Sequence, residues 1–436
     1  MSFELTTIGE YATIQGGYAY KSQDFQSNGN WRVLKIKNVR NGYVDYNDTS
    51  YVADEIAVST TKWVTKTGDI LISMTGSGPS APESLVGRVA KVWKGDPPAL
   101  INQRVGRLCL KDDSSIDKNF LFYLLSLYET QEYLVTNSTG SANQVNISAK
   151  TIESVTYPKV GFQNSKQIAD ILGVLDEHIR LLRDTNATLE AIAQALFKSW
   201  FVDFDPVHAK QQGIAPEGMD EATAALFPDG FEESELGLVP RGWKVETIYK
   251  VANIIYGAPF ASKLFTTEKV GKPLVRIRDL KDETPGIYTE EVLPKGYLIQ
   301  PGDIVVGMDG EFRAYLWGGE PAWLNQRVCI FAPNQGVPKV FVHRSIVPLL
   351  AQVEATETAT TVIHLGKNDI DRFKVVSPHK PVLEAFDAIT SPLYARVVAN
   401  KQTAKNLASL RDTLLPRLIS GQLKISETES ELENAL

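Results

Sequence analysis

Apolar and polar residues alternate in two short stretches of the chain, and a more apolar stretch follows each one. In residues 31–39, WRVLKIKNV, and 272–280, KPLVRIRDL, apolar and basic positions alternate with a period of two, as in half-buried strands. Residues 68–74, GDILISM, and 302–308, GDIVVGM, each predict a turn and then a buried strand. Residues 119–134 have helical apolar spacing instead. The pattern therefore predicts small α+β domains.

Two longer segments have the four-and-three spacing of coiled-coil helices. The first is expected over 165–203 and the second after Pro392, which should begin or kink that helix, while Pro416 should disturb its end. Each seam has a central asparagine, Asn186 and Asn400. In an antiparallel pair these side chains would meet and specify register; the alternative is a polar residue at a wet seam position. The expected seam consists of Leu175, Leu182, Asn186, Leu189, Leu196, Leu393, Val397, Asn400 and Leu407.

The two strand-rich regions are copies of one unit. INQRV at 101–105 recurs as LNQRV at 324–328, and the GDI segments recur in the same order. The offsets between matching segments drift, which is what loop insertions do to two copies of one fold. The first copy carries an additional loop, TGSGPSAPES at 75–84. Variable loops on a repeated scaffold are where the two copies are expected to differ in function.

These patterns divide the chain into successive segments. We expect a first globular domain at 1–160, a central helical region and surface connector at 161–240, a second globular domain at 241–380, a C-terminal helical region at 381–425 and a disordered tail at 426–436.

Charge and composition limit the class of protein. The net charge of −7 arises mainly in residues 161–240, which carry 5 Lys and Arg against 14 Asp and Glu, whereas residues 1–160 carry 16 of each. Overall acidity therefore leaves room for a local DNA-binding surface. No apolar run of membrane-spanning length occurs and the N-terminal residues do not resemble a signal peptide. With 2 cysteines, a reducing, cytoplasmic location and no membrane are expected.

No catalytic or metal-binding motif emerges from the sequence. The 5 histidines lack paired ligand spacing, and neither a P-loop nor a G-x-S-x-G motif is present. Asp96-Pro97-Pro98 is similar to the D-P-P-aromatic motif of DNA methyltransferases, but Ala99 stands where the aromatic residue belongs. Two alternatives stay open: a stand-alone or type II-like DNA adenine methyltransferase component, and a coiled-coil adaptor that binds proteins.

Three further segments carry a family resemblance. ALFKSWFVDFDPV at 195–207, ELGLVPRGW at 235–243 and LRDTLLPRLISGQL at 410–423 resemble type I restriction-modification specificity subunits, and the order of the segments agrees over nearly the whole chain. The resemblance implies an α+β fold, with two tandem α/β target-recognition domains separated by two long helices that pack as an antiparallel coiled coil. It also implies a non-catalytic subunit in which each domain binds one half of a bipartite site in double-stranded DNA.

The same resemblance implies the partners. The helices would set the gap between the half-sites and dock two methyltransferase subunits, and the assembly would recruit two restriction and motor subunits. No cofactor is expected on this chain; S-adenosylmethionine, ATP and Mg²⁺ belong to the partner subunits.

Candidate DNA contacts follow from the side chains that recognise bases and phosphates, which are mainly Arg, Lys, Asn and Gln. Residues identical in both copies are expected to be scaffold or a phosphate clamp, because the two domains should recognise different sequences. Base recognition is expected in the loops that differ, and a solvated strand face is the alternative for the shared basic residues. The candidates are Lys35, Lys37, Asn38, Arg40, Ser77, Gln103, Arg104, Ser141, Asn143, Gln144, Arg276, Arg278, Lys281, Arg313, Gln326 and Arg327.

Overall fold

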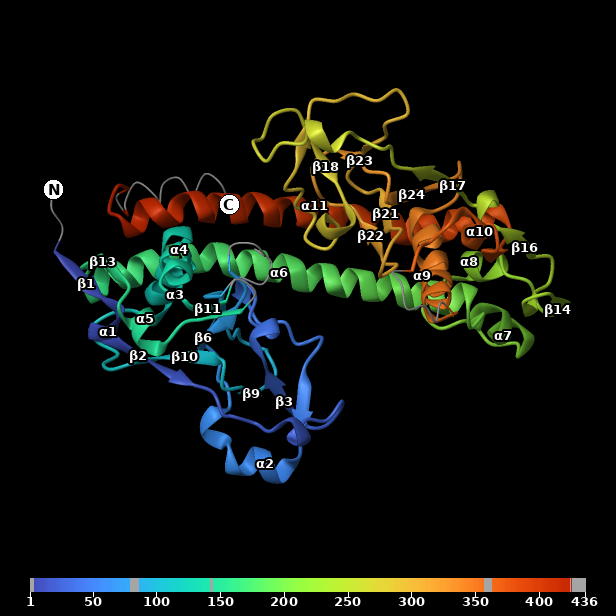
Figure 1. Ribbon diagram of the computed structural model, residues 1–436. Coiled ribbons are helices and arrows are strands. Elements are labelled where there is room, and N and C mark those ends of the chain that lie inside the picture. Colours follow the sequence, from blue (N-terminus) through green and yellow to red (C-terminus); the bar gives the residue numbers. More distant parts are fainter. Residues whose placement is uncertain (1–3, 79–85, 142–143, 357–362, 424, 426–436) are drawn as a thin grey trace. The chain divides into compact units, whose positions relative to one another are not determined.

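The computed structural model describes residues 4–78, 86–141, 144–356, 363–423 and 425 (Figure 1). The chain forms two compact units, and the division between them falls inside both long helices. The first unit comprises Met1–Glu177 with Leu407–Leu436, and the second comprises His178–Asn406.

The first unit has a sheet whose buried central strand, β6, is flanked by antiparallel neighbours. Its strand order is β2 (Ala12–Gly16), β10 (Val105–Leu110), β6 (Ile70–Ser73), β8 (Val89–Lys91) and β4 (Gly42–Tyr43). Beside it lie β5 (Ser50–Val52), β3 (Trp31–Leu34) and β9 (Ala99–Ile101), and a further sheet contains β11 (Thr139–Ser141), β12 (Gln144–Asn146) and β7 (Thr75–Gly76). Strand β1 (Leu5–Thr7) pairs with β13 (Thr156–Pro158), and the short helices are α1 (Ile8–Tyr11), α2 (Asp54–Ser59), α3 (Lys118–Ser126), α4 (Tyr128–Thr136) and α5 (Ala149–Glu153).

The second unit repeats this arrangement. One sheet has the order β17 (Ala252–Tyr256), β24 (Val328–Pro333), β21 (Ile304–Gly307) and β22 (Ala314–Leu316). Another has the order β19 (Tyr288–Thr289), β18 (Lys272–Val275), β23 (Ala322–Leu324) and β20 (Leu298–Ile299). Strand β16 (Lys244–Thr247) pairs with β25 (Lys374–Ser377), β14 (Phe231–Ser234) pairs with β15 (Gly237–Pro240), and the shorter helices are α7 (Asp205–Gln211), α8 (Glu221–Ala225), α9 (Lys339–Thr356) and α10 (Lys367–Ile370).

Strand pairing confirms the internal repeat. Strand β10 lies antiparallel between β2 and β6, as β24 lies between β17 and β21, and the pairs β3–β9 and β18–β23 are both parallel. Gly106 pairs with Ile72 where Cys329 pairs with Val306, so these positions are equivalent. The predicted buried strands of the GDI segments are also confirmed, because every residue of β6 and β21 is buried.

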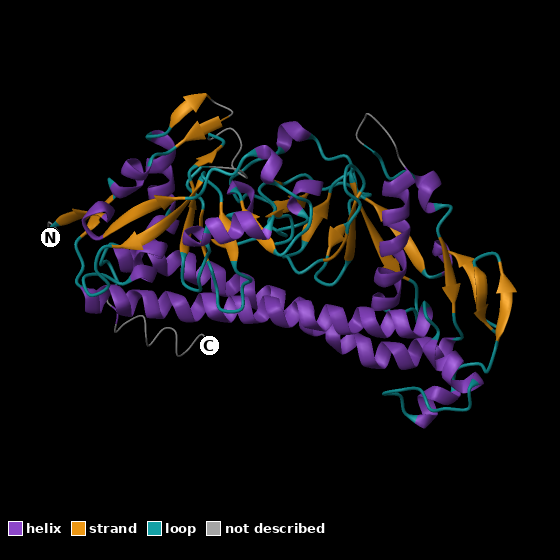
Figure 2. Cartoon of the chain, turned by 90° about the horizontal axis from the view of Figure 1, so that it is seen from below, coloured by secondary structure: helices purple, strands orange, loops and turns teal. Residues whose placement is uncertain are grey.

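Two long helices, α6 (Phe162–Phe201) and α11 (Lys380–Ile419), run without a break (Figure 2). They pack antiparallel: Asp176 contacts Arg411 within the first unit, and Asn186 contacts Asn400 within the second. Of the expected seam residues, Leu175, Asn186, Val397, Asn400 and Leu407 are buried, whereas Leu182, Leu189, Leu196 and Leu393 are half-buried.

Pro392 does not begin the second long helix, because α11 begins at Lys380 and continues through this proline. Proline removes the hydrogen bond to the carbonyl four residues earlier, which belongs to Ala388. Pro392 and Ala388 are both exposed, so water can satisfy that carbonyl. Pro416 lies in the last turn, and the helix ends at Ile419.

The segment ALFKSWFVDFDPV forms an aromatic cluster at the end of α6. Phe201 packs edge-on against Phe386 of α11 and Phe341 of α9, with ring centroids 4.8 and 5.1 Å away. Trp200 packs edge-on against Phe227 at 5.2 Å. The connector after α6 is therefore not only a surface segment, since Phe227 is buried in the core of the second unit.

The alternating stretches are strands over only part of their length. Strand β3 ends at Leu34 and is followed by a 3-10 helix at Ile36–Asn38; β18 ends at Val275, before a 3-10 helix at Ile277–Asp279. The apolar stretch at 119–134 likewise forms two helices, α3 and α4, which meet at Leu127. The side chains of Asn38 and Asp279 accept from the backbone nitrogens that follow β3 and β18, which ends each strand early.

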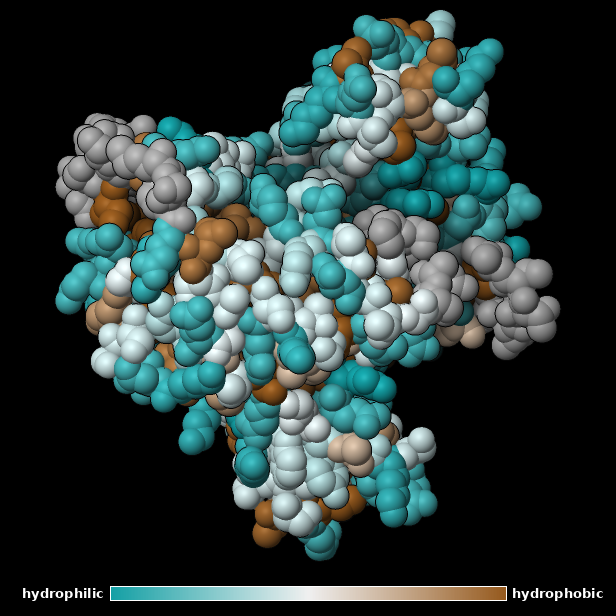
Figure 3. All heavy atoms as spheres, turned by 60° about the vertical axis from the view of Figure 1, so that its left-hand side comes forward, coloured by the Kyte–Doolittle hydropathy of each residue, from teal (hydrophilic) through white to brown (hydrophobic). Residues whose placement is uncertain are grey.

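On the face drawn in Figure 3, hydrophobic residues are scattered among hydrophilic and intermediate ones. Among the described residues, no helix combines the length and the apolar character needed to cross a membrane.

Candidate nucleic-acid interface

A tight turn of the same sequence, Asn-Gln-Arg, occurs at 102–104 and 325–327; we call these the NQR turns. In the first unit the turn joins β9 to β10. The nitrogen of Asn102 donates to the carbonyl of Leu34 over 3.0 Å, and the nitrogen of Met74 donates to that of Arg104 over 2.8 Å. Gln103 and Arg104 are exposed at the tip. Backbone bonds from two other segments thus hold the turn in place.

The NQR turn of the second unit has the same bonds. Asn325 donates from its nitrogen to the carbonyl of Val275 over 3.2 Å, and Met308 donates to the carbonyl of Arg327 over 2.9 Å. Gln326 and Arg327 are again exposed. The NQR turns are therefore equivalent in backbone as well as in sequence, and each presents an amide and a guanidinium to solvent.

A glycine is required beneath each NQR turn. A Cβ on Gly17 would lie 2.2 Å from the carbonyl oxygen of Asn102, and a Cβ on Gly257 would lie 1.9 Å from that of Asn325. Real Cβ atoms do not approach backbone oxygens so closely, so no other residue fits without moving the turn. Gly16, the neighbour of Gly17, has no such contact: its Cβ would lie 3.8 Å from the nearest atom.

A second turn directly follows the strand whose last carbonyl accepts from each NQR turn. We call residues 35–40, after β3, and residues 276–281, after β18, the basic turns. In the first basic turn, Asn38 accepts a hydrogen bond from the Lys35 nitrogen over 2.9 Å. Its amide donates to the carbonyls of Asp45 and Asp48 over 2.9 and 3.0 Å. Asn38 is 2% exposed and both its amide hydrogens are occupied. It organises this loop, and its side-chain amide has no hydrogen left to donate to DNA.

The basic side chains of the first turn lie closer to solvent. Lys37 is exposed and forms an ion pair with Asp48, and Arg40 is half-buried with its Nε atom 3.7 Å from Asp45. Lys35 lies over a phenylalanine ring, and partial burial together with the nearby Lys37 charge lowers its pKa. Lys37 and Arg40 are thus each paired with an aspartate of the same loop.

In the second basic turn, Asp279 takes the place of Asn38. It accepts from the Arg276 backbone nitrogen over 2.9 Å and from the Arg276 guanidinium over 3.0 and 3.2 Å. Arg276 is therefore held against the turn by its own capping residue. Arg278 and Lys281 are exposed, and within the described ranges neither forms an ion pair. They are the residues of this turn that are available for phosphate.

The loop candidates of the first unit have different surroundings. Ser77 is 8% exposed, so it is buried rather than presented on the surface. Gln144 is exposed at the start of β12, opposite Ser141 of β11. Asn143 lies outside the described residues. Gln144 therefore presents its side chain to solvent.

Arg313 lies in the second unit near the end of α9. Its guanidinium donates to Glu354 over 2.6 Å, and this ion pair raises the pKa of Arg313. The Arg313 side chain is 48% exposed. Its charge is thus partly neutralised by a residue of its own unit.

The residues beside the two NQR turns differ. In the first unit, Thr75 and Asn146 pair across β7 and β12, and the Thr75 hydroxyl donates to the Asn146 side-chain oxygen over 2.7 Å. In the second unit, Asp309 and His364 form the corresponding bridge, with 2.6 Å between Oδ1 and Nδ1. Arg327 Nε lies 3.6 Å from the other oxygen of Asp309.

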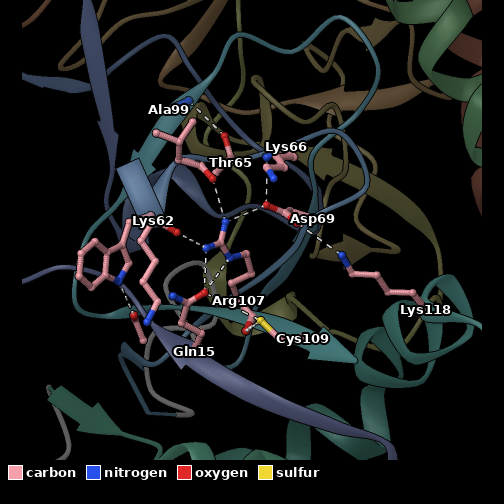
Figure 4. A network of polar contacts seen from close by, with 12 residues as sticks. Gln15, Lys62, Thr65, Lys66, Asp69, Ala99, Arg107, Cys109 and Lys118 are labelled. Atoms are coloured by element: carbon pink, nitrogen blue, oxygen red, sulfur yellow. Dashed lines mark hydrogen bonds and ion pairs between the residues drawn. The ribbon is translucent and has the colours of Figure 1, made fainter. Parts of the chain in front are cut away.

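Arg107 is a structural residue that the sequence reasoning missed (Figure 4). Arg107 is 9% exposed, and its guanidinium donates to Gln15, Asp69 and the carbonyls of Lys62 and Val64 over 2.6 to 3.1 Å. All its donors are thereby used inside the domain. Asp69 is the aspartate of the first GDI segment, so this segment is part of the scaffold.

The Asp-Pro-Pro segment is a structural turn. Asp96 accepts a hydrogen bond from the backbone nitrogen of Trp93 over 2.8 Å, and its own nitrogen donates back to the Trp93 carbonyl. Across the residues that the structure describes, no group of three or more His, Cys, Asp or Glu side chains is placed to hold a metal ion.

Comparison with known proteins agrees with the sequence resemblance. Residues 2–191 match the model of the type I restriction modification DNA specificity domain. The chain is 24% identical over 343 residues to the type I restriction enzyme MjaIX specificity subunit of Methanocaldococcus jannaschii, covering 76% of this chain and 74% of that protein. It is 27% identical over 359 residues to the HindI specificity subunit of Haemophilus influenzae, with 70% and 77% covered.

A solved structure extends the similarity to the whole fold. The crystal structure of the type I restriction-modification S subunit from M. genitalium aligns with a TM-score of 0.50 and 18% identity, covering 96% of both chains. At this identity the comparison supports the shared fold.

Proposed function

We propose that the chain, which is similar to type I restriction-modification specificity subunits, is the non-catalytic DNA-recognition subunit of such a complex. Each unit binds one half of a bipartite site in duplex DNA. The observation that carries the proposal is the repeated junction of an NQR turn with a basic turn, one in each unit.

The chemistry of this junction matches duplex DNA. Exposed Arg and Lys side chains neutralise phosphates, and Arg and Gln have the donor geometry to recognise guanine and adenine in the major groove. Arg104 with Gln103, and Arg327 with Gln326, supply both kinds of group from a turn whose backbone is fixed. Rigid presentation is what base discrimination requires, because a mobile side chain does not favour one base over another.

The paired helices supply the spacing in this proposal. Each has 40 residues, which corresponds to about 60 Å of helix. They fix the length of the unread gap between half-sites and provide the surface on which two methyltransferase subunits dock. Two restriction and motor subunits join that assembly, and S-adenosylmethionine, ATP and Mg²⁺ bind to the partners.

The test is selection of duplex oligonucleotides by the chain co-purified with its methyltransferase partner, followed by mapping of methylated positions. We expect two specified half-sites separated by a fixed unread gap, with affinity that falls steeply as salt rises. One continuous motif would reject the two-domain recognition. Methyl transfer by the chain alone would favour the methyltransferase alternative, and absence of DNA binding with the partner present would favour the protein adaptor.

A further inference from the structure

Beside each NQR turn lies a pair of residues at equivalent positions in the two units, and the residue types of the two pairs differ. The nitrogen of Ile147 donates to the Met74 carbonyl over 3.0 Å, and the nitrogen of Leu365 donates to the Met308 carbonyl over 2.8 Å. Thr75 and Asn146 therefore correspond to Asp309 and His364, because each pair adjoins these bonds. A neutral pair stands in the first unit where the second unit has a carboxylate and an imidazole.

The pair in the second unit restrains its arginine. His364 Nδ1 lies 2.6 Å from Asp309 Oδ1, so this ring nitrogen donates its proton to the carboxylate. The same nitrogen is 3.5 Å from Arg327 Nη1 and has no lone pair left to accept from it. The arginine is thus attracted to Asp309 as an ion pair, with its Nε atom 3.6 Å from the second oxygen of the carboxylate.

This arrangement leaves the outer edge of the guanidinium available. Holding the Nε side of Arg327 orients the two Nη groups, and its side chain remains 57% exposed. Two parallel N–H groups are what the O6 and N7 atoms of guanine accept in the major groove. The adjacent Asp309 charge also reduces attraction to a phosphate.

Arg104 is in a different situation. It is exposed at the same position of its NQR turn, its neighbouring pair is neutral, and its guanidinium forms no ion pair with any described residue. Its full positive charge is available to a phosphate, and no carboxylate orients it.

We propose that Asp309 and His364 position Arg327 to recognise a guanine in the half-site of the second unit, whereas Arg104 contacts a backbone phosphate. The inference rests on the proposed DNA-recognition function. It assigns different roles to two arginines of identical sequence context and makes the neighbouring pair the determinant of the role.

The test compares base preferences of variants co-purified with the methyltransferase partner. R327A should lose the preference for guanine at one position of one half-site and weaken cognate binding by about 5- to 150-fold. D309T/H364N, which carries the pair of the first unit, should also lose that preference while it binds DNA with a steeper dependence on salt. R104A should weaken binding to all sequences alike and reduce the salt slope by about one.

The unaltered half-site in each variant serves as an internal control for folding and assembly. Unchanged base frequencies in R327A and D309T/H364N, with wild-type protein still selecting two half-sites, would overturn this inference alone. Failure of the wild-type complex to select any sequence would instead overturn the proposed function. T75D/N146H, the reciprocal exchange, should leave the second half-site unaltered, and a change there would also contradict the assignment.

Discussion

The side-chain amide of Asn400 donates a hydrogen bond to the side-chain oxygen of Asn186 over 2.9 Å, between the two long helices. The Asn186 amide in turn donates to the Val397 carbonyl over 3.2 Å. Asn186 and Asn400 are 8% and 3% exposed, so each polar group relies on the other helix for its partner. A shift of one helix along the other would leave both unsatisfied, which fixes the register.

Replacing one asparagine should therefore cost more than replacing both. N400L leaves the Asn186 oxygen buried without a donor, and we expect a loss of about 1–3 kcal/mol in the free energy of unfolding. N186L/N400L removes both polar groups and should recover most of that loss. Urea midpoints of the chain measure both effects, with Q402L at an exposed position of α11 as the control. Equal destabilisation by the single and double changes would contradict this account.

Substitutions in a buried ion pair of the first unit should lower the free energy of unfolding more than substitutions in an exposed one. Asp176 accepts from Arg411 over 2.5 Å and from the Tyr123 hydroxyl over 2.8 Å. D176A leaves Arg411 without its inner partner and should cost about 3 kcal/mol, whereas Y123F should cost about 1 kcal/mol. D412N, on the exposed partner of the same arginine, is the control and should cost less than about 1 kcal/mol. If D176A, Y123F and D412N lowered the urea midpoint by the same amount, the buried Asp176–Arg411 pair would contribute no more to stability than the exposed one.

The glycines beneath the NQR turns provide a test of the turns themselves. G17A and G257A should each displace one turn and abolish the base preference of one half-site, since the added Cβ overlaps a backbone oxygen. G16A has room for its methyl group and should retain both preferences. Oligonucleotide selection with the co-purified partner measures the outcome. Two intact half-sites in G17A would show that the turn does not contribute to recognition.

Stability of the second unit should depend on pH through His343. This buried ring receives a hydrogen bond from the Tyr394 hydroxyl at Nδ1 and donates from Nε2 to the Ala314 carbonyl, over 2.6 and 3.1 Å. Burial lowers the pKa of His343 from 6.5 to about 4. The unfolded chain therefore binds more protons between these values, and stability falls as pH drops from 6.5 to 4, by about 3 kcal/mol in total.

The measurement is the urea midpoint as a function of pH. H343Q should remove most of this slope between pH 6.5 and 4, while H379Q, which replaces an exposed histidine, should retain it. An identical slope in wild type and H343Q would assign the acid sensitivity to other groups.

The long helices should determine the gap between half-sites. Removing seven residues from α6 and the seven that face them on α11 shortens the pair by about two turns, or roughly 10 Å. The selected gap should then shrink by about three base pairs, since base pairs are spaced about 3.4 Å apart. A gap of unchanged length would reject the helices as its determinant.

The sequence predicted repeated features better than features that depend on side-chain geometry. The NQR segments and the heptad spacing identified equivalent turns and paired helices, because both signals are local and recur. Periodicity did not reveal that Asn38 and Asp279 cap the backbone behind them and end the strands early. Nor did periodicity predict the contact of Asp309 with His364, because these residues belong to segments 55 residues apart. Arg107 was missed because its strand position gives no sign of its five donors being used.

The pairing of Asp176 with Arg411 has a consequence for synthesis of the chain. The first unit contains residues from both ends of the sequence, and residues 178–406 are translated between them. At about 5–20 residues per second, the ribosome needs roughly 10–45 s to make that stretch. During this interval the carboxylate of Asp176 has no guanidinium partner, and the face of α6 that α11 later covers is open to other proteins. The second unit is synthesised continuously and can mature first, so the part of the molecule that begins earliest is the last to be finished.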